Sequence, residues 1–500
     1  MNPTRTNNEE DLSSNNRDQY FGSRVTESPV DMDKGHLETE ADMESKSESR
    51  EEFYFDKVAA LDAPCLEAPR EPPKFPPHHP SNNPDGGVKA WLAVFGGFLC
   101  LFCSFGWIVG MYRIHPKLHP KLISLAIGVF QDYYSRHQLK KYSPSEISWI
   151  PSTELFMLFV GGPIIGKIYD NYGPQPLLAV GTFFHVFGLF MASFAKNYWQ
   201  ILLSQGICSP IGASCVFYPA MSCLATWFFK KRALAMGLMA CGSSVGGVVL
   251  PIFLERMLPK IGFAWTMRAA ALMILGLLCI ANVTVRSRNA PSPRPFRLQD
   301  FTDPLKEVPY SLTTAGSFFV FLGMFLPFTY LIVQAVHLGA PRSIAVSLVA
   351  ILNGASFFGR LFPGYVADKI GRYNLTIVMM TLTAVSVFAV WTTTRSTGGV
   401  IAFAALYGFT SGAFVSMAPT LIAQISPDMR LIGIRNGTQF AILAVAALIG
   451  SPIGGAIAGT GAQPNYMALQ VFCGICLAVG VVFMTAARIN LSGFKLMVKV

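Results

Sequence analysis

Charged residues are scarce in this sequence of 500 residues. Only 14% of its residues are Asp, Glu, Lys or Arg, whereas soluble domains carry about 25%. Apolar residues make up 52%, and the mean hydropathy is +0.42. This composition excludes an ordinary water-soluble protein. It is typical of a polytopic membrane protein, whose lipid-facing helices must be apolar all round.

Acidic residues are especially scarce after residue 86. Residues 1–86 hold 19 of the 29 acids, and the other 414 residues hold 10 acids and 30 bases. These bases lie between apolar runs, so we expect loops at the negatively charged cytoplasmic membrane surface and no nucleic-acid partner. Segment 1–86 is rich in Ser, Asn and Pro and lacks a signal-peptide pattern. We predict a disordered, acidic cytoplasmic tail there.

The sequence also lacks the motifs of enzymes and of nucleotide-driven pumps. It contains no G-x-x-x-x-G-K-[ST] loop, no G-x-S-x-G and no paired acids within an apolar run. Nine of its ten cysteines lie inside apolar runs, and no His or carboxylate accompanies the two C-x-x-C pairs. We therefore expect no enzymatic activity, no cofactor and no metal.

Twelve apolar runs follow from residue 88, each about 20 residues long and able to cross the membrane as a helix. A polar segment, 287–310, separates six runs from six. The prediction is an all-α membrane protein with twelve transmembrane helices in two pseudo-symmetric six-helix halves. Its predicted parts are an N-terminal half at 88–286, a cytoplasmic central loop at 287–310, a C-terminal half at 311–490 and a cytoplasmic tail at 491–500.

Positive charge in the loops predicts the orientation. An even number of spans places both termini on one side. The loops on that side carry 16 Lys and Arg against 8 on the other side when the anomalous stretch 110–121 is left out. The side richer in bases faces the cytoplasm in most membrane proteins. We therefore expect both termini in the cytoplasm. The predicted location is the plasma membrane, with the vacuolar membrane as the alternative.

A short motif occurs twice at one offset. Residues 166–173 (GKIYDNYG) follow the second run, and residues 364–372 (GYVADKIGR) follow the eighth, 198 positions later. The glycines allow a sharp turn between close helices, and the Asp can cap a helix N-terminus or pair with a base. We predict two loops that gate conformational change, formed by Gly166, Asp170 and Gly173 and by Gly364, Asp368, Gly371 and Arg372.

These loops, the twelve runs and the long central segment resemble the major facilitator superfamily. Residues 85–91 (DGGVKAW) and 227–242 (WFFKKRALAMGLMACG) are similar to the signatures of its monocarboxylate transporter-like (monocarboxylate porter) family. Residues 207–214 (ICSPIGAS) look like the fungal branch of that family. The resemblance covers about residues 88–490. It implies the major facilitator fold and a secondary transporter that works by alternating access.

Arg360 is the strongest candidate for substrate binding. An ionisable group inside a span is costly and is a functional candidate by default. The resemblance implies that an Arg at this place helps to bind a substrate carboxylate, and the alternative is a structural pair with Asp368 or with a loop carboxylate. The family's Asp one turn earlier is replaced by Ser356, and its helix 1 Lys has no clear match. Both departures favour a larger acidic or polar metabolite over lactate or pyruvate.

Two further ionisable residues are candidates for proton coupling. Glu154 lies in the second run and can gain and lose a proton in a low-dielectric site, or instead cap a helix beside Ser152 and Thr153. His185 lies in the third run and can relay protons or simply pack between helices. The uncharged candidates for lining a substrate cavity are Asn353, Gln205, Asn436 and Gln439.

An anomalous insert interrupts the first run. Family members pass within a few residues from a Gly-Trp pair to a G-V-F-Q-x-Y-Y run, but here Gly106 and Trp107 stand 20 residues before 128–134 (GVFQDYY). The segment near 109–127 holds prolines and bases that do not suit a lipid-exposed helix. It is either an unusual external loop or the translation of an unspliced intron, and we favour the intron.

The predicted function is secondary active transport of a small organic metabolite, either an organic acid or a secondary metabolite. The expected partners are this substrate, the lipid bilayer and, as the candidate coupling ion, protons. Import and export both remain open, and the sequence predicts no oligomeric state. The alternative is a non-transporting membrane sensor that signals through its cytoplasmic tail.

Overall fold

The computed structural model describes residues 85–111, 133–134, 137–458, 465–494 and 498. All of them belong to one compact unit of the chain. The predicted tail lies outside the described residues except for Asp85 and Gly86. Most of the anomalous insert, from residue 112 onward, lies outside them as well.

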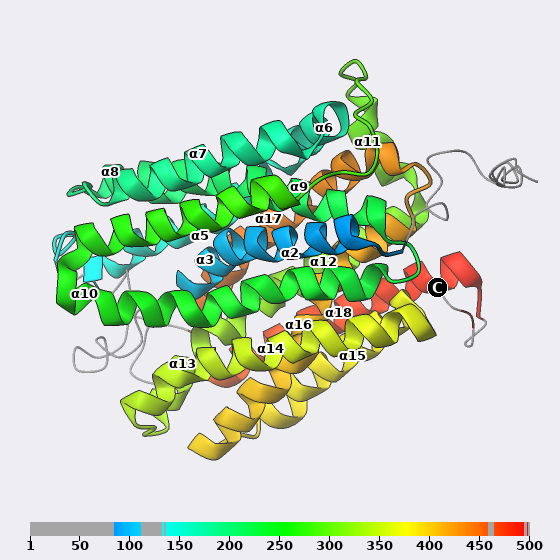
Figure 1. The fold of residues 1–500 in the computed structure, drawn as a ribbon. Helices are drawn as coiled ribbons and strands as arrows, with labels where there is room; N and C mark the ends of the chain where they lie inside the picture. The colour runs from blue at the N-terminus through cyan, green and yellow to red at the C-terminus, as the bar shows by residue number, and fades with distance from the viewer. Residues whose placement is uncertain (1–84, 112–132, 135–136, 459–464, 495–497, 499–500) are drawn as a thin grey trace, which may run out of the picture. The chain divides into compact units, whose positions relative to one another are not determined.

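Helices make up all the regular structure of the described part (Figure 1). From residue 85 to residue 284 they are α2 (Val88–Cys103), α3 (Phe105–Met111), α5 (Pro144–Val160), α6 (Gly162–Tyr172), α7 (Pro174–Ala192), α8 (Tyr198–Ile201), the π-helix η3 (Leu202–Cys208), α9 (Ser209–Trp227) and α10 (Arg232–Thr284). Beyond residue 298 they are α11 (Gln299–Lys306), α12 (Val308–Met324), α13 (Leu326–His337), α14 (Arg342–Ile370), α15 (Arg372–Ser386), the π-helix η4 (Val387–Trp391), α16 (Thr397–Gln424), the 3₁₀-helix η5 (Met429–Leu431), α17 (Ile432–Ala458) and α18 (Tyr466–Ser492).

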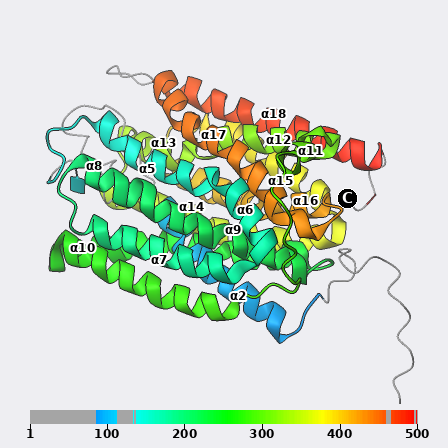
Figure 2. The same cartoon turned by 90° about the horizontal axis from the view of Figure 1, so that it is seen from above.

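These helices form twelve membrane spans. Ten segments of the described residues are long and apolar enough to cross a membrane. One of them, the 53-residue α10, is two successive spans, because Gly262 has non-helical backbone angles (φ 73°, ψ 171°) and the chain turns back there (Figure 1). The 29-residue α14 supplies the remaining span, and charged residues such as Arg360 and Asp368 lower its hydropathy. Figure 2 shows these helices side by side in one bundle.

Local sequence explains where several helices begin. Ser143 and Glu146 form a capping box that starts α5. Gly173 and Gly371 precede α7 and α15 and have φ of 79° and 106°. Only glycine adopts such angles without strain, so each residue ends one span and begins the next within a single position.

Two pairs of helices join the first six spans to the last six at very short range. A Cβ atom on Gly166 of α6 would overlap the carbonyl group of Gly433 in α17, and a Cβ on Gly437 would overlap that of Gly162. In the equivalent pair, a Cβ on Gly364 of α14 would lie 2.8 Å from the carbonyl oxygen of Ala233 in α10. Both contacts join the second span of one set of six to the fifth span of the other.

Candidate functional site

Asp170 links the end of α6 to the start of α17. Its Oδ1 accepts a hydrogen bond from the backbone N–H of Gly433, and its Oδ2 accepts one from Ile434, both at 2.9 Å. The first N–H groups of a helix have no partner within the helix and carry a partial positive charge. The carboxylate of one set of six spans therefore caps a helix of the other set.

Asp368 makes the equivalent contact on the opposite pair of helices. Its carboxylate accepts hydrogen bonds from the backbone N–H groups of Ala233 (3.1 Å) and Leu234 (3.0 Å) at the start of α10. Arg372 pairs with Asp368 at 3.0 Å and also donates to the carbonyl oxygen of Phe229. We call the end of the bundle that carries Asp170 and Asp368 the gate end.

Asp85 also binds the turn that precedes α10. Its Oδ1 accepts hydrogen bonds from the backbone N–H groups of Phe229 (2.6 Å), Lys230 (2.6 Å) and Lys231 (3.2 Å). Asp85 is the first residue of the motif at 85–91, but this role of its side chain was not predicted. Its place in a motif that precedes the first span was the available signal. The turn before α10 is thus held by one carboxylate of its own set of spans and by Asp368 of the other.

The central loop closes over the end of α6. Lys167 forms an ion pair with Asp300 (2.9 Å), and Asn171 exchanges two hydrogen bonds of 3.2 Å with the backbone of Arg294. Arg294 in turn lies 3.5 Å from Asp428, before η5. Burial raises the pKa of Asp428, but hydrogen bonds from Arg430 outweigh burial and lower it overall. Asp428 is therefore a carboxylate at neutral pH.

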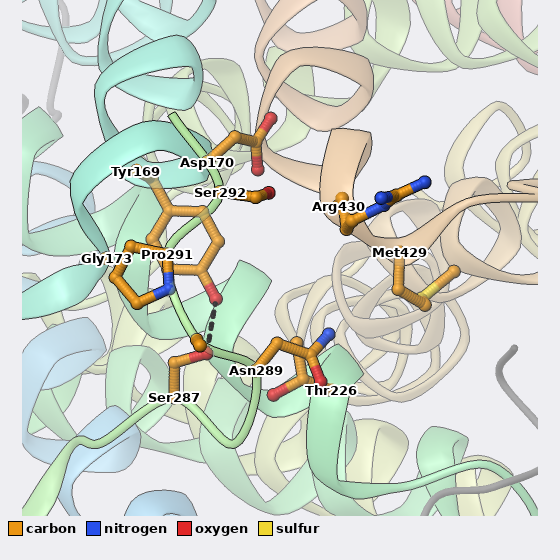
Figure 3. Close-up of a pocket in the computed structure, with 11 residues that line it drawn as sticks. Tyr169, Asp170, Gly173, Thr226, Ser287, Asn289, Pro291, Ser292, Met429 and Arg430 are labelled. Atoms are coloured by element: carbon orange, nitrogen blue, oxygen red, sulfur yellow. Dashed lines mark hydrogen bonds between the residues drawn. The ribbon is translucent and has the colours of Figure 1, made fainter. Parts of the chain in front are cut away.

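A pocket at the gate end shows how the loop lies on Asp170 (Figure 3). The Tyr169 hydroxyl lies 3.5 Å from the Ser287 hydroxyl, and the backbone N–H of Ser292 donates to the carbonyl oxygen of Asp170 at 3.4 Å. Met429 and Arg430 form the wall contributed by η5. Opening this end requires the loop and η5 to separate.

Arg360 points from α14 to α10 and crosses between the two sets of spans. One of its terminal nitrogens donates to the carbonyl oxygen of Ala240 at 2.5 Å and also to the hydroxyl of Ser243. Its Nε has no hydrogen-bond partner in the part of the chain that the structure describes. Asp368, the alternative partner that the sequence suggested, is occupied by α10 and Arg372. The guanidinium retains capacity for an anion or another acceptor.

Glu154 belongs to a second buried polar group. It is 1% exposed, and the side chains of Gln205 and Trp107 lie beside it. Neither carboxyl oxygen makes a hydrogen bond of good geometry within the described ranges. The hydroxyl of Tyr134 donates to Gln205 Oε1 at 2.6 Å and also lies near Glu154. The structure thus brings Glu154 and Gln205 together.

His185 has partners on both ring nitrogens. Its Nδ1 lies 2.9 Å from the Ser209 hydroxyl, and its Nε2 lies 3.0 Å from the carbonyl oxygen of Cys103. A neutral ring protonated on Nε2 satisfies both contacts, since that nitrogen donates while Nδ1 accepts. The arrangement ties α7 to α9 and α2, as expected of a packing residue.

The remaining polar candidates are buried in two places. Asn353 donates to the carbonyl oxygen of Val349 at 3.1 Å and packs against Gly247 of α10, near Arg360 along α14. Gln439 donates to the hydroxyl of Ser317 at 3.2 Å. Asn436 is fully buried, and neither atom of its amide group has a partner among the described residues. Two of these side chains therefore lie on α17 and one on α14.

Comparisons with known proteins agree with this arrangement. Residues 93–379 and 313–496 match the sequence profile of the Major Facilitator Superfamily. The chain is 50% identical over 416 residues to "MFS-type transporter 1" of Ophiocordyceps sp. (strain BCC 1869), which covers 83% of this chain and 89% of that protein. It is 46% identical to the fujikurins efflux protein of Gibberella fujikuroi, over 81% of this chain and 83% of that one. It is 37% identical to the aspyridones efflux protein of Emericella nidulans, over 82% and 80%.

Solved structures share the fold at low sequence identity. The human organic anion transporter MFSD10 (TETRAN) superposes with a TM-score of 0.61 at 15% identity, over 80% of this chain and 100% of that one. The transporter FucP in its outward conformation superposes with a TM-score of 0.56 at 14% identity, over 78% and 98%.

Proposed function

Because the chain belongs to the major facilitator superfamily, we propose that it exports a small organic secondary metabolite by alternating access. The predicted fold of twelve helices is confirmed, and a transporter is favoured over the alternative of a membrane sensor. Export is the proposed direction because relatives at 46% and 37% identity are named as efflux proteins for fujikurins and aspyridones.

The paired contacts of Asp170 and Asp368 are the observation that supports alternating access. Each carboxylate binds the first turn of a helix in the other set of spans, so the two contacts break together when the sets separate at the gate end. This end is closed in the structure. We propose that it faces the cytoplasm, in agreement with the distribution of basic residues in the loops, and that the protein lies in the plasma membrane.

Arg360 is the proposed contact for an acidic or polar group of the substrate. Its hydrogen bonds to Ala240 and Ser243 orient the guanidinium, and its Nε has no partner among the described residues. We propose that the chain belongs to the monocarboxylate transporter-like branch, and that Ser356 in place of the coupling Asp shifts it towards larger substrates.

Glu154 is the proposed proton carrier. It is buried, and it makes no good hydrogen bond within the described part of the chain. A buried carboxyl that lacks a fixed cation is well suited to exchange a proton between the two sides of a membrane. The contacts of His185, by contrast, support a packing role and give it no free nitrogen for a relay.

Metabolite profiling of cells and medium, with and without the gene, tests the proposal. We expect one compound to accumulate in deleted cells and to disappear from the medium, and the intact gene to restore its release. A compound that stays unused in the medium of deleted cells would instead show import.

Two variants sharpen the experiment. A chain that lacks residues 1–80 should still restore release, whereas a sensor that signals through its tail would lose its effect. Arg360→Ala should reduce release at unchanged protein level, and unchanged release would remove Arg360 from the binding site.

A further inference from the structure

A cluster of aromatic rings lies directly behind the gate end. We call it the ring cluster, and its members are Phe105, Phe159, Phe217, Tyr218, Phe321 and Phe440. All six side chains are at most 3% exposed. They come from α3, α5, α9, α12 and α17, which belong to both sets of spans.

The two sets of spans meet ring to ring within this cluster. Phe440 of the last six spans stacks on Phe159 of the first six, with centroids 5.4 Å apart and planes at 23°. Phe217 and Tyr218 meet Phe440 edge-on at 5.6 and 5.9 Å, and Phe321 lies 5.8 Å from Phe159. These distances are those of favourable aromatic pairs. The ring cluster therefore holds the two sets together in the closed state.

The ring cluster must come apart when the gate end opens. Phe159 and Phe440 each lie three residues from a glycine of the tight contact between Gly162 and Gly437. Separation of those glycines separates the stacked rings and exposes them to water, which is unfavourable in proportion to the apolar area exposed. A ligand shifts a conformational equilibrium only through its difference in affinity for the two states. A ligand that covers the rings therefore promotes opening.

The surroundings of Arg360 and Glu154 lie next to the ring cluster along α3. Phe105 belongs to the cluster, and a Cβ on Gly106 would lie 3.2 Å from the Cα of Ser243, which binds Arg360. The next residue, Trp107, lies beside Glu154. Three consecutive residues thus adjoin the aromatic surface, the backbone of the serine that binds Arg360, and the buried carboxyl.

We propose that the ring cluster is the surface that binds the body of the transported molecule, and that this molecule is a planar aromatic or conjugated metabolite with an acidic or hydrogen-bonding group. The planar body replaces the contact between Phe159 and Phe440 once the gate end opens, and the polar group reaches Arg360. The assignment rests on the proposed function of export. It adds the substrate class, since a short aliphatic acid cannot cover the separated rings.

Binding to the purified full chain in lipid nanodiscs tests the proposal. The probes are 1-pyrenebutanoic acid, which has a planar fused ring system, and butanoic acid, which has the same acid chain without it. We expect the pyrene acid to bind at least about tenfold more tightly, in line with the energy of one or two aromatic pairs. We also expect it to accelerate amide hydrogen exchange at Gly433 and Ile434, because it promotes opening of the gate end. Equal affinity for the two acids, or the same uptake by empty nanodiscs, would overturn the proposal.

Matched variants locate the binding. Phe440→Ala should weaken pyrene-acid binding about tenfold, and Phe440→Leu, which keeps apolar volume, covers the case in which the alanine variant does not fold. The control is Phe183→Ala. Phe183 also stacks on a phenylalanine, Phe187, at 5.7 Å and 11°, but it is 61% exposed on the outer face of α7. Unchanged affinity in both Phe440 variants, or an equal loss in the control, would contradict the assignment.

The profiling experiment separates this proposal from the proposed function. A compound retained by deleted cells that is small and aliphatic would refute the substrate class and leave export intact. If no compound is retained, export fails, and the nanodisc measurement still decides whether the ring cluster binds planar molecules.

Discussion

Asp170→Asn should open the gate end without any ligand. The carboxylate accepts two backbone hydrogen bonds at 2.9 Å from the start of α17. Hydrogen bonds to a charged group contribute about 1.5–3 kcal/mol each. An asparagine keeps one acceptor oxygen and loses the charge, so we expect the closed state to lose about 2–3 kcal/mol. Since about 1.4 kcal/mol corresponds to a factor of ten, the open population should rise roughly 30- to 150-fold.

Amide hydrogen exchange measures this rise in the open population directly. The N–H groups of Gly433 and Ile434 are themselves the donors to Asp170, so peptides covering 432–436 should exchange faster by about that factor. Peptides covering 233–236 should accelerate as well, because Asp368 holds the N–H groups of Ala233 and Leu234 in the other pair of helices. Asp368→Asn should produce the same double effect.

The control is Asp303→Asn. Asp303 pairs with Lys306 at 2.7 Å on α11, and both side chains are more than half exposed, so this pair contributes little to stability. Asp303→Asn should leave the amide hydrogen exchange of both peptides unchanged. If Asp170→Asn accelerates only 432–436, the two carboxylates are independent helix caps. If neither peptide changes, Asp170 does not hold the gate end closed.

Three further predictions concern the same parts of the molecule. Gly433→Ala should also open the gate end, because its Cβ would press on Asp170 and on the Gly166 carbonyl. The control is Gly276→Ala, whose new Cβ has nothing within 4 Å. Equal amide hydrogen exchange in the two variants would contradict the close contact. Glu154→Gln should abolish substrate accumulation driven by a pH gradient in proteoliposomes and spare the exchange of labelled for unlabelled substrate. Equal loss of both activities would indicate a structural role. The pKa of Asp428 is lowered in the folded protein, so its stabilising effect is complete above the ordinary carboxyl value of about 3.9 and is lost as the pH falls through the lower folded value. The difference in melting temperature between the parent and Asp428→Asn should therefore be constant from about pH 8 to pH 5 and shrink as the pH falls below about 4. A difference that is as large at pH 3 as at pH 7 would refute it.

The positions of the spans were predictable because the membrane imposes one length on all of them. Among the twelve apolar runs, the one at 398–423 forms α16, Thr397–Gln424, and the one at 343–366 lies within α14, Arg342–Ile370. The charged residues of α14 did not prevent the prediction of this span, because the run is long enough to cross the membrane even with them. The sequence also shows two separate apolar runs at 232–256 and 264–286, and Gly262, where α10 reverses, lies between them.

The partners of the site residues were not predictable from the sequence. An Asp after a span indicates a helix cap, but it does not indicate that Asp170 reaches an N–H group 263 positions away. The ring cluster was equally hidden, because 39 phenylalanines are spread through the apolar runs and lipid contact explains any one of them. Only packing shows that Phe159 and Phe440 face each other while Phe183 faces outward.

The contacts of Glu154 also bear on the anomalous insert, and we propose that they support the intron interpretation. Trp107 lies before the insert and beside Glu154, and Tyr134 lies after it and donates to Gln205 in the same polar group. Removal of the 20 residues between Trp107 and Gly128 would place Tyr134 seven positions after Trp107. Residues seven apart share one face of a helix, so a single continuous first span would present both side chains to Glu154 and Gln205. Sequencing of the mature transcript across codons 107–128 should therefore show the shorter form, and an intact spacing of 20 residues there would refute the interpretation.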